Sequence, residues 1–327
     1  MTALPVGAGA PSIPAAPPPP IPGDNPQSAD KIELGRRLFY DKRLSVTGDY
    51  SCASCHQQAH AFADSRARAQ GATGQQHARN ALSLANVVYR PVLTWFDPKL
   101  TRLEYQLMVP LLGHNPVEMG ASEPQVLAVL NGDAEYRRRF GTVFGGEITL
   151  ATMARAIASF ERSLISFNAP WDRYRAGDEA AIPPAAKRGA ALFFSEETQC
   201  FRCHPAPHFT DTYTSADLPF AEIGFHDIGL ATDQTRVRAP SLRNVAVTAP
   251  YMHDGSVATL DEVIEIYKSG GLAGARDRAE HSAYVRPFTL TEQEKADLIA
   301  FLESLTDDDF LTDPRYADPF AATPPAR

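Results

Sequence analysis

Apolar residues recur at helical spacing in two segments, one in each half of the chain. The first stripe comprises Met153, Ile157, Phe160 and Leu164, and the second comprises Leu298, Phe301, Leu302 and Leu305. Residues spaced three or four apart share one face of an α-helix, and an apolar face turns toward a core. Thr291 and Glu294 add a capping box at the start of the second helix. The pattern therefore predicts an amphipathic helix that closes each half.

A short pattern, G-x-x-L-F, also occurs once in each half. Residues 35–39 (GRRLF) and 189–193 (GAALF) each lie in a short helical pattern that precedes a C-x-x-C-H motif. Pro183 and Pro184 mark a boundary between the halves. Strand signals are few, and the long loops are rich in Gly and Pro. We therefore expect a mainly α protein in which one unit is used twice, with an N-terminal domain at residues 31–180 and a C-terminal domain at residues 181–327.

The first 30 residues are rich in Pro and Ala and lack the apolar residues of a core. Such a segment is typical of an extended or disordered leader or tether. The sequence contains no run of about 18 apolar residues, so it predicts no membrane span. No signal peptide is visible in this numbering, in which a cleaved one would be missing.

Composition limits the class of partner. The chain has 327 residues, 44% of them hydrophobic and 21% charged, which is ordinary for two globular domains. Its formal net charge of −8 argues against nucleic acid or an anionic membrane as the main partner.

The four cysteines carry the strongest chemical signal. They form two C-x-x-C-H motifs, completed by His56 and His204, and the pairs are Cys52 with Cys55 and Cys200 with Cys203. In this motif both thiols add to the vinyl groups of one haem, and the following histidine binds the iron. A redox dithiol, a zinc site or a pair of disulfides would each explain a lone C-x-x-C. Because both pairs carry the histidine and no cysteine is left over, we predict two covalent c-type haems and a periplasmic location.

Further stretches resemble the diheme cytochrome c peroxidase and MauG superfamily. These are residues 34–41 (LGRRLFYD), 115–120 (NPVEMG) and 240–255 (PSLRNVAVTAPYMHDG). Within it, residues 93–95 (LTW), 224–230 (GFHDIGL) and 305–319 resemble the methanobactin-associated diheme enzymes, MbnH and its relatives. The resemblance runs from about residue 31 to the C-terminus. It implies two domains similar to class I cytochrome c, each with one haem.

The resemblance implies different surroundings for the two irons. The second haem has a distal ligand fourteen residues after His253, which is methionine in peroxidases and tyrosine in MauG-like enzymes, and that position is Tyr267. A capping box, Thr259 with Glu262, precedes it, and Tyr267 shares a helix face with Leu260, Val263 and Ile264. From the residues alone, a core tyrosine bonded elsewhere is the alternative.

The resemblance places the distal pocket of the first haem at Gln106, Pro110 and Glu118. A proline there keeps a coordination position open, Glu118 is the general acid–base, and Gln106 orients peroxide. The alternatives are a helix-surface glutamine and a solvated glutamate. His77 and His114 are other distal candidates, and we expect His77 to be structural.

Two further sites follow from the resemblance alone. One is a tryptophan that relays oxidising equivalents between the haems, for which Trp95 is the candidate although counting back from Gln106 reaches Phe96. The other is a calcium ion held by the Asn80 side chain and by the backbone carbonyls of Thr248 and Pro250, since oxygen ligands suit this cation.

The implied function is oxidation of a protein by hydrogen peroxide through a bis-Fe(IV) state. In MbnH-like enzymes the target is a tryptophan of a periplasmic copper-binding (MbnP-like) protein, which is converted to kynurenine. MauG carries a surface tryptophan just before its second haem motif, where this chain has Thr198 and Gln199. Two alternatives remain: a cytochrome c peroxidase that reduces peroxide to water, and a two-haem electron carrier without enzymatic activity.

Overall fold

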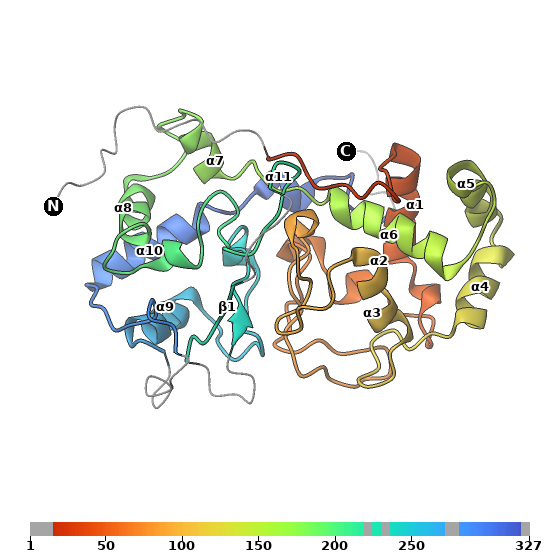
Figure 1. Cartoon of the computed structure of the whole chain (residues 1–327), viewed down its shortest axis with the longest axis horizontal. Coiled ribbons are helices and arrows are strands. Elements are labelled where there is room, and N and C mark those ends of the chain that lie inside the picture. The colour runs from red at the N-terminus through yellow and green to blue at the C-terminus, as the bar shows by residue number, and fades with distance from the viewer. Residues whose placement is uncertain (1–15, 219–223, 230–235, 272–280, 322–327) are drawn as a thin grey trace.

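The computed structural model describes residues 16–218, 224–229, 236–271 and 281–321, which form two helical domains side by side (Figure 1). The first domain contains α1 (Ala29–Tyr40), α2 (Leu103–Gln106), α3 (Met108–Leu112), α4 (Glu123–Gly132), α5 (Ala134–Phe144) and α6 (Leu150–Ser163). The second contains α7 (Pro170–Arg175), α8 (Pro184–Phe193), α9 (Leu260–Lys268) and α10 (Glu292–Glu303). The last helix, α11 (Asp308–Thr312), lies where the domains meet.

Each domain is built on one crossing of two helices, α1 against α6 and α8 against α10. The apolar stripes expected on α6 and α10 are buried, and the capping box of Thr291 and Glu294 is present. A Cβ atom on Gly35 would lie 1.9 Å from the carbonyl oxygen of Ala156, and one on Gly189 would lie 1.8 Å from that of Asp297. The glycine of each G-x-x-L-F pattern therefore lets the two backbones touch, which explains why the pattern occurs twice.

The chain crosses between the domains at both ends of the second half. In α7, Trp171 packs on Phe301 of the second domain with ring centroids 4.9 Å apart. After α10 the chain returns, and Phe310 packs against Phe62 of the first domain at 5.8 Å. The Tyr316 hydroxyl also donates to the first domain. The two apolar cores therefore do not separate at residue 180. Trp171 belongs to the second core, and Phe310 and Tyr316 belong to the first.

Part of the expected N-terminal tether is attached to the protein. The Tyr89 hydroxyl donates to the Pro17 carbonyl at 2.6 Å, and Asp24 pairs with Arg102 at 2.7 Å. The Asn25 side chain is buried and donates to Glu104 at 2.8 Å. Residues 16–28 therefore differ from the free segment that composition predicts, and residues 1–15 lie outside the described residues.

The haem motifs lie on short turns between the helices. Cys52–Ser54 and Cys200–Arg202 each form a 3-10 turn, and the other 3-10 turns are Lys42–Leu44, Gln58–His60, Val87–Tyr89 and Val245–Val247. The described strands are β1 (Phe225–His226) and β2 (Val237–Arg238), which pair antiparallel in a long loop of the second domain. Among the described helices, none is long and apolar enough to cross a membrane.

Candidate haem centres

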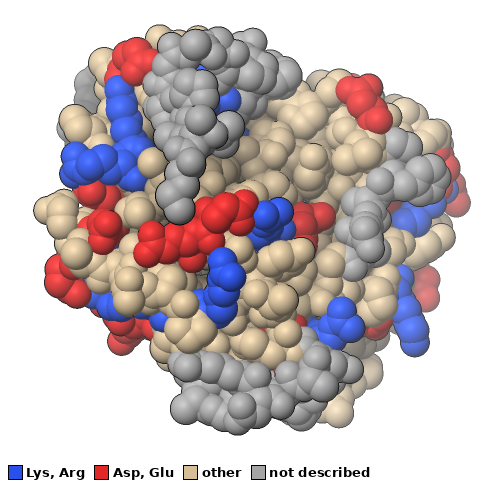
Figure 2. All heavy atoms as spheres, turned by 60° about the vertical axis from the view of Figure 1, so that its left-hand side comes forward, with Lys and Arg blue, Asp and Glu red and all other residues tan. Residues whose placement is uncertain are grey.

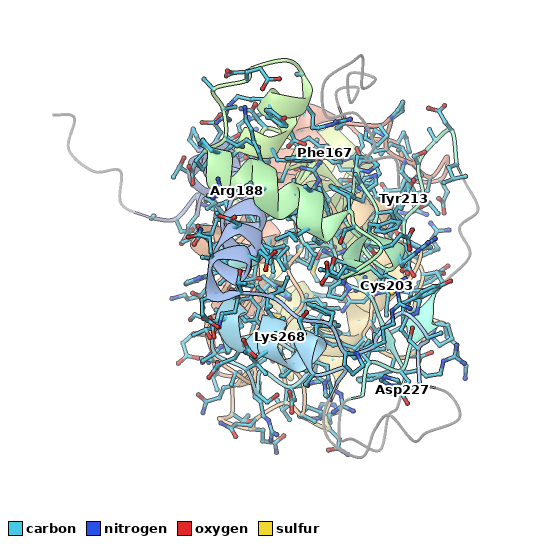
Figure 3. All side chains as sticks on the ribbon, turned by 90° about the vertical axis from the view of Figure 1, so that its left-hand side faces the viewer. Phe167, Arg188, Cys203, Tyr213, Asp227 and Lys268 are labelled. Carbon is cyan, nitrogen blue, oxygen red and sulfur yellow. The ribbon has the colours of Figure 1, made fainter. Side chains whose placement is uncertain are left out.

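Two cavities hold the two C-x-x-C-H motifs, one in each domain. The first is lined by Cys52, Cys55 and His56, and the second by Cys200, Cys203 and His204. Figure 3 looks onto the second domain, with Cys203 labelled after α8, Arg188 on α8 and Lys268 at the end of α9. The sulfur atoms and the imidazole of each motif therefore face one common space.

Both motif histidines are prepared as metal ligands. The Nδ1 atom of His56 donates to the carbonyl of Phe62 at 2.8 Å, and that of His204 donates to the carbonyl of Phe209 at 3.0 Å. This bond leaves the Nε2 lone pair for the iron. Burial lowers the pKa of both rings, so they are neutral, as a ligand must be.

The cysteines are free of disulfides. Burial raises the pKa of Cys52 above its usual range and that of Cys200 to about 11. Such thiols are protonated at neutral pH, which does not suit a redox dithiol. When the sulfur atoms form thioether bonds to a haem, no thiolate charge has to be buried.

Two arginines that line the cavities, the buried Arg238 and the half-buried Arg90, provide a separate test of the fit. Arg238 lines the second cavity with no exposed surface, and its Nη2 atom has no hydrogen-bond partner. Arg90 lines both cavities and donates to the carbonyl of Ala85. Neither forms an ion pair with a carboxylate in the described parts of the chain, and burial lowers their pKa values to about 9 for Arg90 and about 10 for Arg238. A buried cation requires an anionic partner, and the carboxylates of a haem supply one.

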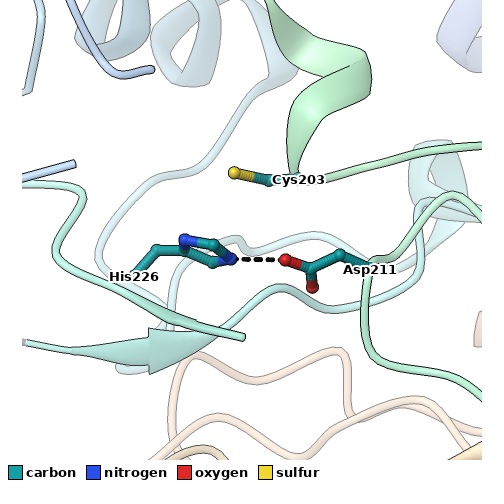
Figure 4. A group of neighbouring side chains, drawn as sticks. All are labelled: Cys203, Asp211 and His226. Atoms are coloured by element: carbon teal, nitrogen blue, oxygen red, sulfur yellow. Dashed lines mark hydrogen bonds and ion pairs between the residues drawn. The ribbon is translucent and has the colours of Figure 1, made fainter. Parts of the chain in front are cut away.

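Cys203, Asp211 and His226 lie close enough together to suggest a metal site (Figure 4). However, the His226 ring is bonded to Asp211, and this carboxylate raises the pKa of His226 to about 10. A protonated imidazole has no lone pair for a metal, and the Cys203 sulfur belongs to the haem motif. His226 instead lines the second cavity, and its bond to Asp211 holds the ring there.

The expected distal residues of the first haem line the first cavity. Gln106 ends α2, Pro110 lies in α3, and Glu118 lies in the loop that follows. Burial raises the pKa of Glu118, as suits a group that both takes and returns a proton near neutral pH. His77 lines this cavity as well, whereas His114 is exposed and does not.

Tyr267 lines the second cavity together with His204, and so do Leu260, Val263 and Ile264, the other members of its predicted helix face. The capping box of Thr259 and Glu262 that starts this helix is present. In the described parts of the chain the Tyr267 hydroxyl has no hydrogen-bond partner, and burial raises its pKa above the usual range. A phenol in this environment stays protonated unless a cation binds it, because a bound metal reverses the effect of burial on acidity.

Trp95 lies in the wall shared by both cavities, and Phe96 lines the first cavity alone. The indole Nε1 donates to the carbonyl of Asn80 at 3.0 Å, and the carbonyl of Trp95 accepts from the backbone of Arg238 at 3.1 Å. The first bond lies within the first domain, and the second joins that domain to β2 of the second.

The three expected calcium ligands, Asn80, Thr248 and Pro250, all line the second cavity. The Asn80 amide nitrogen donates to the carbonyls of Arg66 and Ala67 at 3.2 and 3.3 Å. Its side-chain oxygen therefore points away from these carbonyls and is left for another partner.

Comparison with known proteins supports this arrangement. A family model described as di-haem cytochrome c peroxidase matches residues 29–180, and one described as cytochrome c matches residues 186–306. The methylamine utilization protein MauG of Methylophilus methylotrophus is 35% identical over 88% of this chain and 85% of its own length. The chain belongs to the di-haem cytochrome c peroxidase and MauG family. A member from Denitromonas iodatirespirans, a cytochrome-c peroxidase, is 35% identical over 90% of this chain and 86% of its own.

A solved structure of the same family is similar over nearly the whole chain. The crystal structure of a MauG-like protein associated with microbial copper homeostasis is 43% identical, with a TM-score of 0.89 over 93% of this chain and 97% of that one. This diheme family member is accordingly a peroxide-dependent oxidoreductase with two c-type haems, and the expected two-domain cytochrome c architecture is confirmed.

Arg90, Arg238 and the pair of Asp211 and His226 are site residues that the sequence did not predict. No local pattern marks them, since each is a single polar residue in a loop or short strand. A charged residue at Arg238, within a two-residue strand beside apolar positions, was the one available signal. The role of Arg238 could not be predicted from this signal, because it depends on which cavity the strand lines.

Proposed function

We propose that this protein oxidises a tryptophan side chain of a periplasmic partner protein, with hydrogen peroxide as the oxidant. The haems, when bound, supply the redox chemistry by holding the two oxidising equivalents of each peroxide. Peroxide takes up two electrons and two protons and leaves as two waters. The 43% identity to a MauG-like protein associated with microbial copper homeostasis supports a copper-binding partner.

The observation that carries this proposal is the place of Tyr267 in the cavity of His204, where its hydroxyl has no hydrogen-bond partner among the described residues. An anionic oxygen ligand stabilises ferric and higher oxidation states, whereas methionine raises the potential and stabilises Fe(II). A centre with this ligand stores an oxidising equivalent in preference to an electron. That property favours a protein oxidase over a peroxidase that must be reduced before it reacts.

The residues of the first cavity act on peroxide itself. We assign Gln106 to orient it by hydrogen bonding and Pro110 to leave the distal position without a protein ligand. Glu118 takes a proton from the bound peroxide and returns it to the departing oxygen, so the carboxyl ends the step in its starting state. Trp95 lies between the two cavities, and its indole is the group we assign to relay the second equivalent.

An oxidising equivalent must also leave the second haem toward the partner. Thr198 and Gln199 line the second cavity and cannot be oxidised readily. Tyr284 lines the same cavity, and 46% of its surface is exposed. Acidic and basic side chains are interspersed over the face of the molecule shown in Figure 2. We assign Tyr284 as the exit because it is an oxidisable ring that reaches both the cavity and the solvent.

The test is a titration of the diferric holoprotein with hydrogen peroxide, followed by optical and Mössbauer spectroscopy. High-valent iron at both haems without prior reduction is expected, together with slow turnover of a reduced small cytochrome c. Reaction only after half-reduction, with fast oxidation of that cytochrome, would instead establish a peroxidase, as some relatives are named. No reaction in either state would leave an electron carrier.

A further inference from the structure

His77 is held in one orientation at the edge of the first cavity. Its Nδ1 atom accepts the backbone N–H of Arg79 at 3.1 Å, and its own backbone N–H donates to the carbonyl of Ala69 at 2.7 Å. A ring nitrogen that accepts a hydrogen bond carries no proton, so in the neutral ring the proton is on Nε2. Burial, and then the charge of Arg79, lower the pKa of His77, which keeps the ring neutral.

The Nε2 atom faces the carboxyl group of Glu118. The distance from Nε2 to Oε1 is 3.6 Å, and both side chains line the first cavity. This is too long for a direct hydrogen bond. A small rotation of either side chain, or one bridging water, makes the contact.

The other charged side chains that line this cavity are Arg79, Arg90, Asp97 and Glu161. Among the described residues, His77 alone places an ionisable nitrogen within 4 Å of the Glu118 carboxylate. The thiols of Cys52 and Cys55, which also interact with Glu118, carry no charge once they are thioethers. Burial alone accounts for the raised pKa of Glu118. The Nε2–H of His77 is therefore the nearest donor that can favour the carboxylate over the acid.

We propose that His77 is a positioning residue that holds Glu118 toward the first haem cavity in its ionised form, ready to take the proton of peroxide. This inference rests on the proposed function, in which Glu118 is the base. It gives His77 a role other than the structural one expected from sequence and other than that of an iron ligand. The acid form of Glu118 gains nothing from the Nε2–H donor, so the contact acts on one protonation state.

The test compares His77→Phe, which removes the donor, with His77→Gln, whose amide N–H can replace it. His114→Gln is the matched control, because His114 is exposed and lies outside the cavity. The protonation of Glu118 is followed over pH by infrared difference spectroscopy of the holoprotein, with Glu118→Gln to assign the band. The second readout is the pH dependence of hydrogen cyanide binding to the ferric protein, since cyanide binds as the anion and needs a base to accept its proton.

In His77→Phe the carboxyl midpoint should move to higher pH by about one unit, which is about a tenfold loss of ionised Glu118 below the midpoint. The fall in cyanide binding on the acid side of the pH profile should shift to higher pH by the same amount. His77→Gln should recover most of the wild-type profile, and His114→Gln should match wild type.

An unchanged midpoint in His77→Phe would overturn the proposal. So would a change of the first haem from low-spin to high-spin in both His77 variants, because that result makes His77 an iron ligand. Failure of the proposed function looks different: the wild-type protein would need prior reduction to react with peroxide, while the carboxyl titration would still respond to His77.

Discussion

The indole Nε1 of Trp95 donates a hydrogen bond to the backbone carbonyl of Asn80 at 3.0 Å, and both residues line both haem cavities. The bond holds the ring in the wall that separates the two centres. Phe96, the neighbour that counting along the sequence favours, lies against His253 with ring centroids 5.4 Å apart and lines the first cavity alone.

Trp95→Phe should restrict oxidation by peroxide to the first haem. Phenylalanine keeps most of the packing but is far harder to oxidise than indole, so the relay is lost. Freeze-quenched Mössbauer spectra should show high-valent iron at one haem in place of two. Phe96→Leu is the matched control and should behave as wild type, and a variant of Trp95 that still oxidises both haems would exclude the relay.

Replacement of Tyr267 should change the potential of the second haem. Tyr267→Met should raise it, because a thioether stabilises Fe(II) relative to tyrosinate, and the variant should then require half-reduction before it reacts with peroxide. Tyr267→Phe should leave an open position that binds cyanide. Spectropotentiometric titration checks both, and a potential that is the same in all three proteins would show that Tyr267 does not bind the iron.

Removal of the arginine charges that line the two cavities should lower the haem potentials. A nearby cation disfavours the more positive ferric state, so its loss makes reduction harder. Arg238→Gln should lower the potential of the second haem, and Arg90→Gln should lower both, since Arg90 lines both cavities. Arg138→Gln, at an exposed ion pair with Glu135 on α5, is the control. Unaltered potentials in Arg90→Gln and Arg238→Gln would mean that both arginines have other partners.

Glu161 should make stability depend on pH. Burial raises its pKa from 4.5 to about 8, and its Oε2 atom has no hydrogen-bond partner. The folded protein therefore holds this proton more tightly than the unfolded chain, and stability falls as pH rises from about 4.5 to about 8. The shift corresponds to at most about 5 kcal/mol.

Glu161→Gln should remove this fall in stability. The free energy of unfolding of the variant should therefore increase relative to that of wild type as pH rises. The free energy of unfolding of the holoprotein, measured in guanidinium at about pH 5 and about pH 8, tests this. Glu147→Gln, at an exposed position, should keep the wild-type dependence. If the curves of Glu161→Gln and wild type run parallel, the carboxyl of Glu161 is not the cause.

Calcium should stabilise the junction between the domains if Asn80 binds it with the carbonyls of Thr248 and Pro250. At a hundredfold excess over its dissociation constant a ligand adds about 2.7 kcal/mol. Chelation should therefore lower the thermal midpoint of wild type and have little effect on Asn80→Ala, whose backbone bond to Trp95 is retained. An equal response to chelator in both proteins would place the ion elsewhere.

Features that depend on neighbouring residues were predictable from the amino-acid sequence. The C-x-x-C-H motifs, the capping boxes and the face shared by Leu260 and Tyr267 all arise from residues within a few positions of one another. Such spacings set direction on a turn or helix before any tertiary contact forms. Both haem motifs and the helices α6, α9 and α10 could therefore be predicted.

The residues that line each cavity from distant parts of the chain depend on the tertiary structure. The place of Trp95 between the cavities, the positions of Arg90 and Arg238, and the facing of His77 and Glu118 depend on contacts between segments distant in sequence. The return of Phe310 to the first core is of the same kind. A loop residue carries no periodicity that tells which surface it will meet, because that is set by how the long loops pack between the two domains.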